Sequence, residues 1–138
     1  MTPSRRALGL VAVGGAVGAL GRYGLTRAFP VGAGTFPTTT FVVNVSGAFV
    51  LTVLLEWLAR RGTPEHWLRL LIGVGVLGAF TTFSTFAAEL AVLWRDHERT
   101  TAVEYAVASV VAGVLAVLLG LVVTGWRRAT PLPDEGES

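Results

Sequence analysis

Four long apolar stretches, separated by short polar segments, constrain this chain more than any other feature of its sequence. A helix needs roughly 20 mainly apolar residues to cross the ~30 Å hydrocarbon core of a bilayer. The stretches that meet this requirement cover residues 7–27, 38–58, 67–94 and 101–126. We therefore predict an all-α membrane protein with four transmembrane helices in a single domain, residues 1–128. A short polar tail, residues 129–138, is expected to be disordered.

The composition supports a membrane protein and argues against several other classes. Only 14% of the 138 residues are charged, whereas soluble domains average about 25%. All four tryptophans lie at the ends of apolar stretches, where indole rings prefer to sit at the membrane–water interface. The chain has no cysteine, which excludes disulfides and thiolate metal sites. It also has no basic run typical of a nucleic-acid surface.

The third stretch, residues 67–94, is unusual because its centre is poor helix material. Glycines recur up to Gly78, and the run Thr-Thr-Phe-Ser-Thr-Phe follows at residues 81–86. Because glycine and threonine both disfavour helix, we predict a break between Gly78 and Thr82. Backbone groups unpaired at that depth must be buried, line a cavity or bind an ion. The alternative is a continuous helix whose hydroxyl side chains bond to the preceding turn.

The first stretch carries a GxxxG pair, Gly14 and Gly18, a spacing that lets two membrane helices approach closely. The sequence does not tell whether the partner helix belongs to the same subunit. Arg22 follows near the end of this stretch, where it either reaches the interface or keeps an anion vestibule positive. Glu89 and Glu104 also lie near the ends of their stretches, which is compatible with plain interfacial positions.

The polar residues at membrane depth favour a small anion. They are mostly hydroxyl and amide side chains, whereas a cation- or proton-driven transporter usually needs a buried carboxylate. Phe80, Phe83 and Phe86 recur every three residues on one helix face, and the edge of an aromatic ring is electropositive. Such donors can replace the hydration that an anion gives up. His66 and His97 fall in connecting segments, and no nucleophile or phosphate-binding motif occurs, so we do not expect an enzyme.

Arginines indicate how the chain is oriented in the membrane. One side carries Arg5, Arg6, Arg60, Arg61, Arg69, Arg127 and Arg128, and the opposite side carries Arg27, Arg95 and Arg99. Four spans place both termini on the first side, and the positive-inside rule favours a cytoplasmic location for them. The bias is moderate, since several of these arginines have acidic neighbours.

Three motifs resemble the Fluc (CrcB) family of fluoride channels. They are Gly14-Gly15-x-x-Gly18-Ala19-x-x-Arg22-Tyr23, Thr40-x-x-x-Asn44-x-x-Gly47-x-Phe49 and Gly75-x-x-Gly78-Ala79-x-Thr81-Thr82-Phe83-Ser84-Thr85-Phe86. The match covers nearly all of the apolar part of the chain, and the Thr-Thr-Phe-Ser-Thr-Phe run is its most specific part. Thr39, Thr52 and Ala79 stand where the family commonly has glycine, which predicts altered packing rather than lost function.

The resemblance implies an antiparallel, dual-topology homodimer in the cell inner (plasma) membrane, where it passively exports fluoride from the cytoplasm. It implies one structural Na⁺ at the dimer interface, held by the backbone carbonyls of Gly78 and Thr81. Arg22 would lie at a vestibule or stabilise the dimer. The residues that would line the fluoride pathway are Thr40, Asn44, Phe83, Ser84, Thr85, Phe86, Tyr105 and Ser109.

Two other functions stay open at this point. A small multidrug-type exporter also has four helices, but it depends on a buried glutamate in its first span, and residues 7–27 contain no acid. A non-transporting membrane scaffold subunit would suit the glycine-rich stretches but would not need the Phe-Ser-Thr-Phe run. The arginine bias also leaves a choice between a dual-topology homodimer and a heterodimer with an oppositely inserted homologue.

Overall fold

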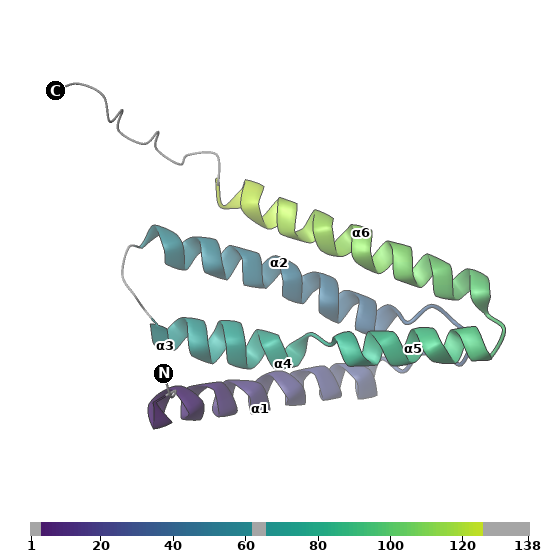
Figure 1. The fold of residues 1–138 in the computed structure, drawn as a ribbon, viewed down its shortest axis with the longest axis horizontal. Coiled ribbons are helices and arrows are strands. Elements are labelled where there is room, and N and C mark those ends of the chain that lie inside the picture. Colours follow the sequence, from purple (N-terminus) through teal and green to yellow (C-terminus); the bar gives the residue numbers. More distant parts are fainter. Residues whose placement is uncertain (1–3, 62–65, 126–138) are drawn as a thin grey trace, which may run out of the picture.

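The computed structural model describes residues 4–61 and 66–125, and all regular secondary structure within them is helical (Figure 1). Helix α1 spans Arg5–Ala28, α2 spans Thr38–Arg60 and α6 spans Arg99–Val123. A segmented helix lies between α2 and α6. Its segments are α3 (His66–Leu68), the π-helix η1 (Arg69–Leu77), α4 (Gly78–Phe80) and α5 (Phe83–Arg95).

Within the described residues, four helical units are long and apolar enough to cross a membrane, which confirms the predicted number of spans. These units are Arg5–Ala28, Thr38–Arg60, Arg69–Arg95 and Arg99–Val123. The predicted end of the fourth stretch, residue 126, and the predicted tail, residues 129–138, lie outside the described residues. The protein is therefore a multi-pass membrane protein.

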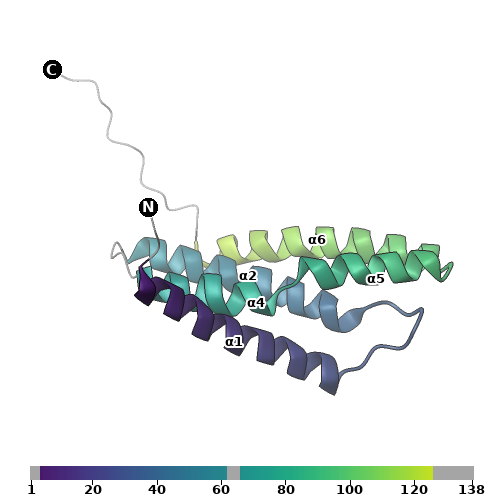
Figure 2. The same ribbon diagram turned by 60° about the horizontal axis from the view of Figure 1, so that its bottom comes forward.

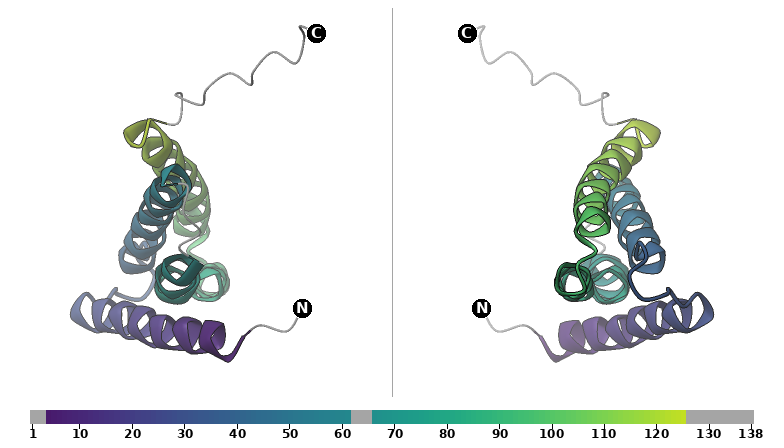
Figure 3. Two further views of the ribbon diagram at one scale, coloured as in Figure 1. Left: turned by 90° about the vertical axis from the view of Figure 1, so that its left-hand side faces the viewer. Right: turned by 90° about the vertical axis from the view of Figure 1, so that its right-hand side faces the viewer.

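In the half of the molecule that contains η1, the spans lie in the order α6, α2, segmented helix and α1 (Figure 1). In the other half, α5 lies beside α6 (Figure 2). The end-on views show the same order, with α1 beneath the segmented helix (Figure 3). Contacts are concentrated between α1 and the η1–α4 half of the segmented helix, and between α2 and α6, while α5 packs against α6. The start of α1 and the end of α6 lie at the same end of the molecule (Figure 2).

The GxxxG pair of α1 packs within the subunit. A Cβ atom at Gly14 would collide with the carbonyl oxygen of Leu71, and one at Gly18 would collide with that of Val76. Facing them, a Cβ at Gly75 would lie 2.9 Å from the Cα of Gly14. Small residues thus let the backbones of α1 and η1 touch, the packing mode that membrane helices commonly use. The sequence left open whether the GxxxG pair packs within one subunit or between two, and this contact shows that it packs within one.

The buried core is small, and large apolar side chains remain exposed on every span. Tyr105 and Val43 are the largest fully buried side chains, whereas Val17, Leu20 and Leu119 are each more than half exposed. Twenty-six large apolar side chains are exposed among the described residues, far more than the scattered few that need no explanation on a soluble monomer. The exposed faces are therefore suited to lipid and to a protein partner within the membrane.

Candidate functional site

The third span is broken at Thr81 and Thr82. Their backbones are extended, with φ/ψ angles of −75°/155° and −150°/117°. The helix resumes at Phe83, where the Thr82 side chain caps α5 by accepting a hydrogen bond from the amide of Thr85 at 3.1 Å. The predicted break is thus present at the C-terminal end of the predicted interval, and the alternative of a continuous helix is wrong.

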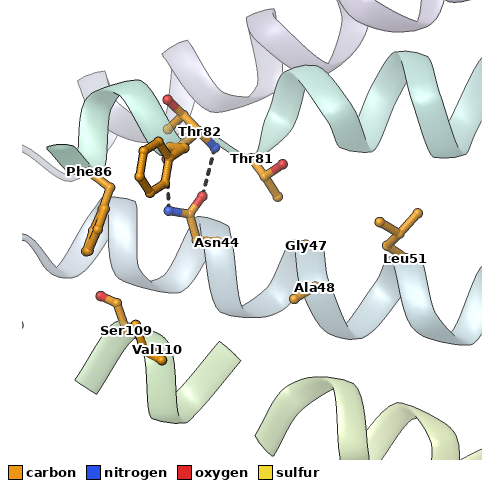
Figure 4. Close-up of a pocket in the computed structure, with 10 residues that line it drawn as sticks. Asn44, Gly47, Ala48, Leu51, Thr81, Thr82, Phe86, Ser109 and Val110 are labelled. Atoms are coloured by element: carbon orange, nitrogen blue, oxygen red, sulfur yellow. Dashed lines mark hydrogen bonds between the residues drawn. The ribbon is translucent and has the colours of Figure 1, made fainter. Parts of the chain in front are cut away.

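Asn44 of α2 binds the break with both ends of its side-chain amide (Figure 4). The amide of Thr82 donates to Asn44 Oδ1 at 2.8 Å, and Asn44 Nδ2 donates to the Thr82 carbonyl at 3.0 Å. In a continuous helix, the amide of Thr82 would instead bond to the carbonyl of Gly78. A side chain from a neighbouring span has therefore replaced a helical hydrogen bond, at a depth where unpaired backbone groups are costly.

Arg22 of α1 is the second polar side chain that reaches this region. Its Nε donates to the carbonyl of Ala79, in the last turn before the break, at 3.2 Å. The side chain is partly buried. Arg22 therefore bonds to the last turn before the helix break, a contact that none of the three roles considered from the sequence had included.

A pocket of about 400 Å³ opens beside the break, between α2, α5 and α6 (Figure 4). Four of the eight predicted pathway residues line it, namely Asn44, Phe83, Phe86 and Ser109. Thr81, Thr82 and small or apolar side chains of α2 and α6 complete the wall. The structure thus brings together residues from three spans that the sequence could only place one by one.

Aromatic and hydroxyl groups give this pocket its chemistry. The rings of Phe83 and Phe86 lie 5.8 Å apart between centroids, and Phe83 is 80% exposed on a single subunit. The hydroxyl oxygen of Ser109 is buried, and no hydrogen-bond partner for it occurs among the described residues. Because buried polar groups normally have a partner, this hydroxyl is available to a ligand or to water.

Thr40 and Tyr105, two further predicted pathway residues, bind Glu89 of α5. Thr40 Oγ1 donates to Glu89 Oε1 at 2.7 Å, and the Tyr105 hydroxyl donates to Oε2 at 2.7 Å. Tyr105 is fully buried, and its ring packs against Phe36 and Phe86 with centroid distances of 5.2 Å and 5.0 Å. The carboxyl group of Glu89 thus has two internal partners, which its position near a span end did not predict.

A helical register could have revealed this cluster. Thr40 precedes Asn44 by one helical turn on α2, and Glu89 follows Thr85 by one turn on α5. Asn44 of α2 meets the break at Thr82, and α2 and α5 run antiparallel. The turn of α2 before Asn44 therefore lies beside α5, where Thr40 can reach Glu89. The signal exists in the sequence, but it requires knowing which residues form the first contact.

The last two predicted pathway residues, Ser84 and Thr85, bond locally. The hydroxyl of Thr82 lies 3.0 Å from Thr85 Oγ1 and 3.2 Å from Ser84 Oγ. These three hydroxyls therefore form a chain of hydrogen bonds at the first turn of α5, next to the pocket. Whether fluoride passes them stays a prediction.

Comparisons with known proteins assign the family. The family model described as "CrcB-like protein, Camphor Resistance (CrcB)" matches residues 9–121. This chain, a multi-pass membrane protein with a broken third span, belongs to the CrcB family. The resemblance inferred from the three motifs is thereby confirmed.

Named relatives agree with this assignment. The "Fluoride-specific ion channel FluC" of Novosphingobium aromaticivorans is 48% identical over 118 residues, which cover 83% of this chain and 93% of the relative. That of Chelativorans sp. is 44% identical over 113 residues, covering 81% and 90%. "Fluoride-specific ion channel FluC 1" of Lactiplantibacillus plantarum is 39% identical over 117 residues, covering 84% and 97%.

Proposed function

We propose that this chain is a fluoride-specific ion channel of the bacterial plasma membrane that lets fluoride leave the cytoplasm passively. The observation that carries the proposal is the pocket beside the helix break, where Asn44, two phenylalanine rings and the buried hydroxyl of Ser109 meet. Family membership and the printed names of the relatives support it. An enzymatic role is not proposed, because a passive channel needs only binding groups along a path.

The lining groups suit a small, strongly hydrated anion. Fluoride must exchange its water shell for hydrogen-bond donors and positive dipoles of comparable strength. The edges of the Phe83 and Phe86 rings offer positive dipoles, and the Ser109 hydroxyl offers a donor with no internal partner among the described residues. Thr40, Ser84, Thr85 and Tyr105 extend the proposed path, but there fluoride would have to compete with existing hydrogen bonds.

The physiological role follows from acid–base chemistry. Hydrogen fluoride is a weak acid that crosses membranes in its neutral form and ionises in the less acidic cytoplasm, where the anion is trapped. A passive channel lets the anion leave down its electrochemical gradient, helped by the negative interior. This lowers the cytoplasmic concentration of fluoride, and hence its toxicity, without an energy-coupling domain.

We also propose that two copies assemble as an antiparallel, dual-topology homodimer. Phe83 is 80% exposed in the single subunit, although it lines the pocket. If lipid covered the exposed side of Phe83, the ring could not contact an ion in an aqueous path. A second subunit is therefore needed to cover this side of the pocket. Reporter fusions to both ends of the chain test this assembly, and a single orientation in the membrane would rule out the inverted homodimer.

The structural Na⁺ implied by the resemblance also fits the break. The amide that would normally bond to the Gly78 carbonyl is held by Asn44, and the extended backbone of Thr81 turns its carbonyl away from the axis of α4. As the resemblance implies, carbonyl oxygens of Gly78 and Thr81 from each subunit would hold the ion, which would supply fixed positive charge at the interface.

Fluoride efflux from proteoliposomes tests the proposed function, with chloride efflux as the selectivity control. We expect fast efflux of fluoride alone. Phe83→Ile should slow it because an aliphatic side chain has no positive ring edge, and Asn44→Asp should slow it because the donor to the Thr82 carbonyl is lost. Phe29→Ile is the matched control, since Phe29 is also exposed but lies outside the pocket.

Three results of this assay would contradict the channel. These are an absence of fluoride efflux from folded dimer, equal efflux of chloride, and unchanged efflux after Phe83→Ile. Proton-coupled efflux of an organic cation would support the multidrug-type exporter instead, and no transport of any kind would support the scaffold subunit.

A further inference from the structure

Arg22 reaches the helix break because α1 lies unusually close to it. A Cβ atom at Gly18, one turn before Arg22, would collide with the carbonyl of Val76 and lie 3.0 Å from the amide of Phe80. Residues spaced three and four apart share a helix face, so this close contact directs Arg22 toward the end of α4. Its Nε then donates to the Ala79 carbonyl at 3.2 Å.

This hydrogen bond replaces one that the break removes. In an unbroken helix, the Ala79 carbonyl would accept from the amide of Phe83, four residues later. The extended backbone after Phe80 carries that amide away. An unpaired carbonyl at this depth is costly, and the chain could recover the lost bond by closing the break into a helix. Arg22 on one side and Asn44 on the other remove that advantage.

We propose that Arg22 is a positioning residue whose Nε–H group, rather than its positive charge, keeps the third span broken. In a continuous helix, the amides of Thr82 and Thr85 would bond to the carbonyls of Gly78 and Thr81. These amides bond instead to Asn44 and to the Thr82 hydroxyl, so the two carbonyls are available as ligands while the span stays broken. The consequence for transport rests on the proposed channel function, but the consequence for folding does not. A vestibule role would require only a positive charge near the path. A substitution must therefore keep the N–H donor to preserve the positioning role, but keep the charge to preserve the vestibule role.

Three substitutions separate a donor from a charge. Arg22→Gln places an N–H donor the same number of bonds from Cα as Nε, but without charge. Arg22→Met has a similar length and neither donor nor charge. Arg22→Lys keeps the charge but puts a methylene group in the place of Nε and moves the N–H donors one bond farther from Cα. Arg27→Gln is the control for loss of charge from α1, because Arg27 is exposed in the last turn of the same helix.

The measurement is the melting temperature of the purified protein in detergent, in sodium chloride and in choline chloride, together with fluoride efflux. We expect Arg22→Gln and Arg27→Gln to melt close to the wild type and to keep its stabilisation by sodium. Arg22→Met and Arg22→Lys should melt roughly 5 °C lower. They should also lose the sodium response and slow efflux by about tenfold.

The proposal would be overturned if Arg22→Lys matched the wild type in melting temperature and efflux while Arg22→Gln and Arg22→Met were equally impaired. That result would show that the positive charge of Arg22 is what matters. The proposal would also be overturned if all three variants matched the wild type, or if Arg22→Gln failed to fold. If the wild type conducts no fluoride but the expected order of melting temperatures holds, the positioning role stands and the channel fails. If fluoride efflux is selective but the order follows charge, the channel stands and the positioning role fails.

Discussion

The two halves of the third span contact their neighbours in different ways, one through backbone atoms and the other through side chains. The first half, η1 and α4, meets α1 through backbone atoms, with glycines on both sides of the contact. The second half, α5, meets α2 and α6 through side chains, which include Glu89 and an aromatic cluster around Tyr105. The extended residues Thr81 and Thr82 separate the two halves.

This difference shows what the break contributes to the architecture. Two extended residues shift the second half, so that α4 lies against α1 while α5 lies against α6 (Figure 1). One span can then provide a closely packed backbone on one side of the break and hydrogen-bonding side chains on the other.

The largest effect is expected where backbones touch, in the first half. Gly18→Ala introduces a Cβ atom that collides with the carbonyl of Val76. Backbone atoms cannot move aside as a flexible side chain does, so we expect a loss of about 3 kcal/mol in stability. The yield of monodisperse protein and its melting temperature measure the effect.

Gly24→Ala is the matched control on the same helix, because a Cβ there meets nothing within 4 Å. If both alanine variants behave alike, backbone contact does not define the first half and the comparison between the two halves fails.

A smaller effect is expected in the second half, at Glu89. Its carboxyl group accepts hydrogen bonds from Thr40 and from Tyr105. In Glu89→Gln one of the two acceptor oxygens becomes an amide donor, which leaves one hydroxyl without its acceptor. We expect a loss of about 1–2 kcal/mol, measured as a lower melting temperature.

Glu104→Gln is the control for this change. Glu104 is exposed on α6, and its side chain makes no hydrogen bond among the described residues, so its substitution should leave the melting temperature near that of the wild type. Equal melting temperatures for the two variants would show that the Glu89 cluster does not stabilise α5 against α2 and α6.

The smallest effect on stability is expected at Ser109. Its buried hydroxyl has no partner in the described part of the chain, so Ser109→Ala breaks no internal hydrogen bond. The free energy of unfolding should change by less than about 0.5 kcal/mol, while fluoride efflux should fall if the hydroxyl serves the ion. Ser46→Ala, which removes an exposed hydroxyl bonded to its own helix, is the control. A marked loss of stability with unchanged efflux would make Ser109 a packing residue.

The sequence by itself determined the four spans and the position of the break. Both depend on local properties that are visible along the chain, namely the length of apolar stretches and the poor helix propensity of glycine and threonine. Pathway residues could be predicted only through the resemblance of motifs, and four of the eight do meet in one pocket. No pattern along the sequence predicted the π-helical winding of η1.

Only the tertiary structure decided which groups meet across the spans. It placed the glycine pair against η1 of the same subunit, Arg22 on the Ala79 carbonyl and Glu89 between two hydroxyls. Each of these contacts joins residues from different spans, so it depends on how the helices cross, how far they rotate and where the break shifts α5. Local propensity fixes none of these quantities, because they result from the packing of all four helices at once.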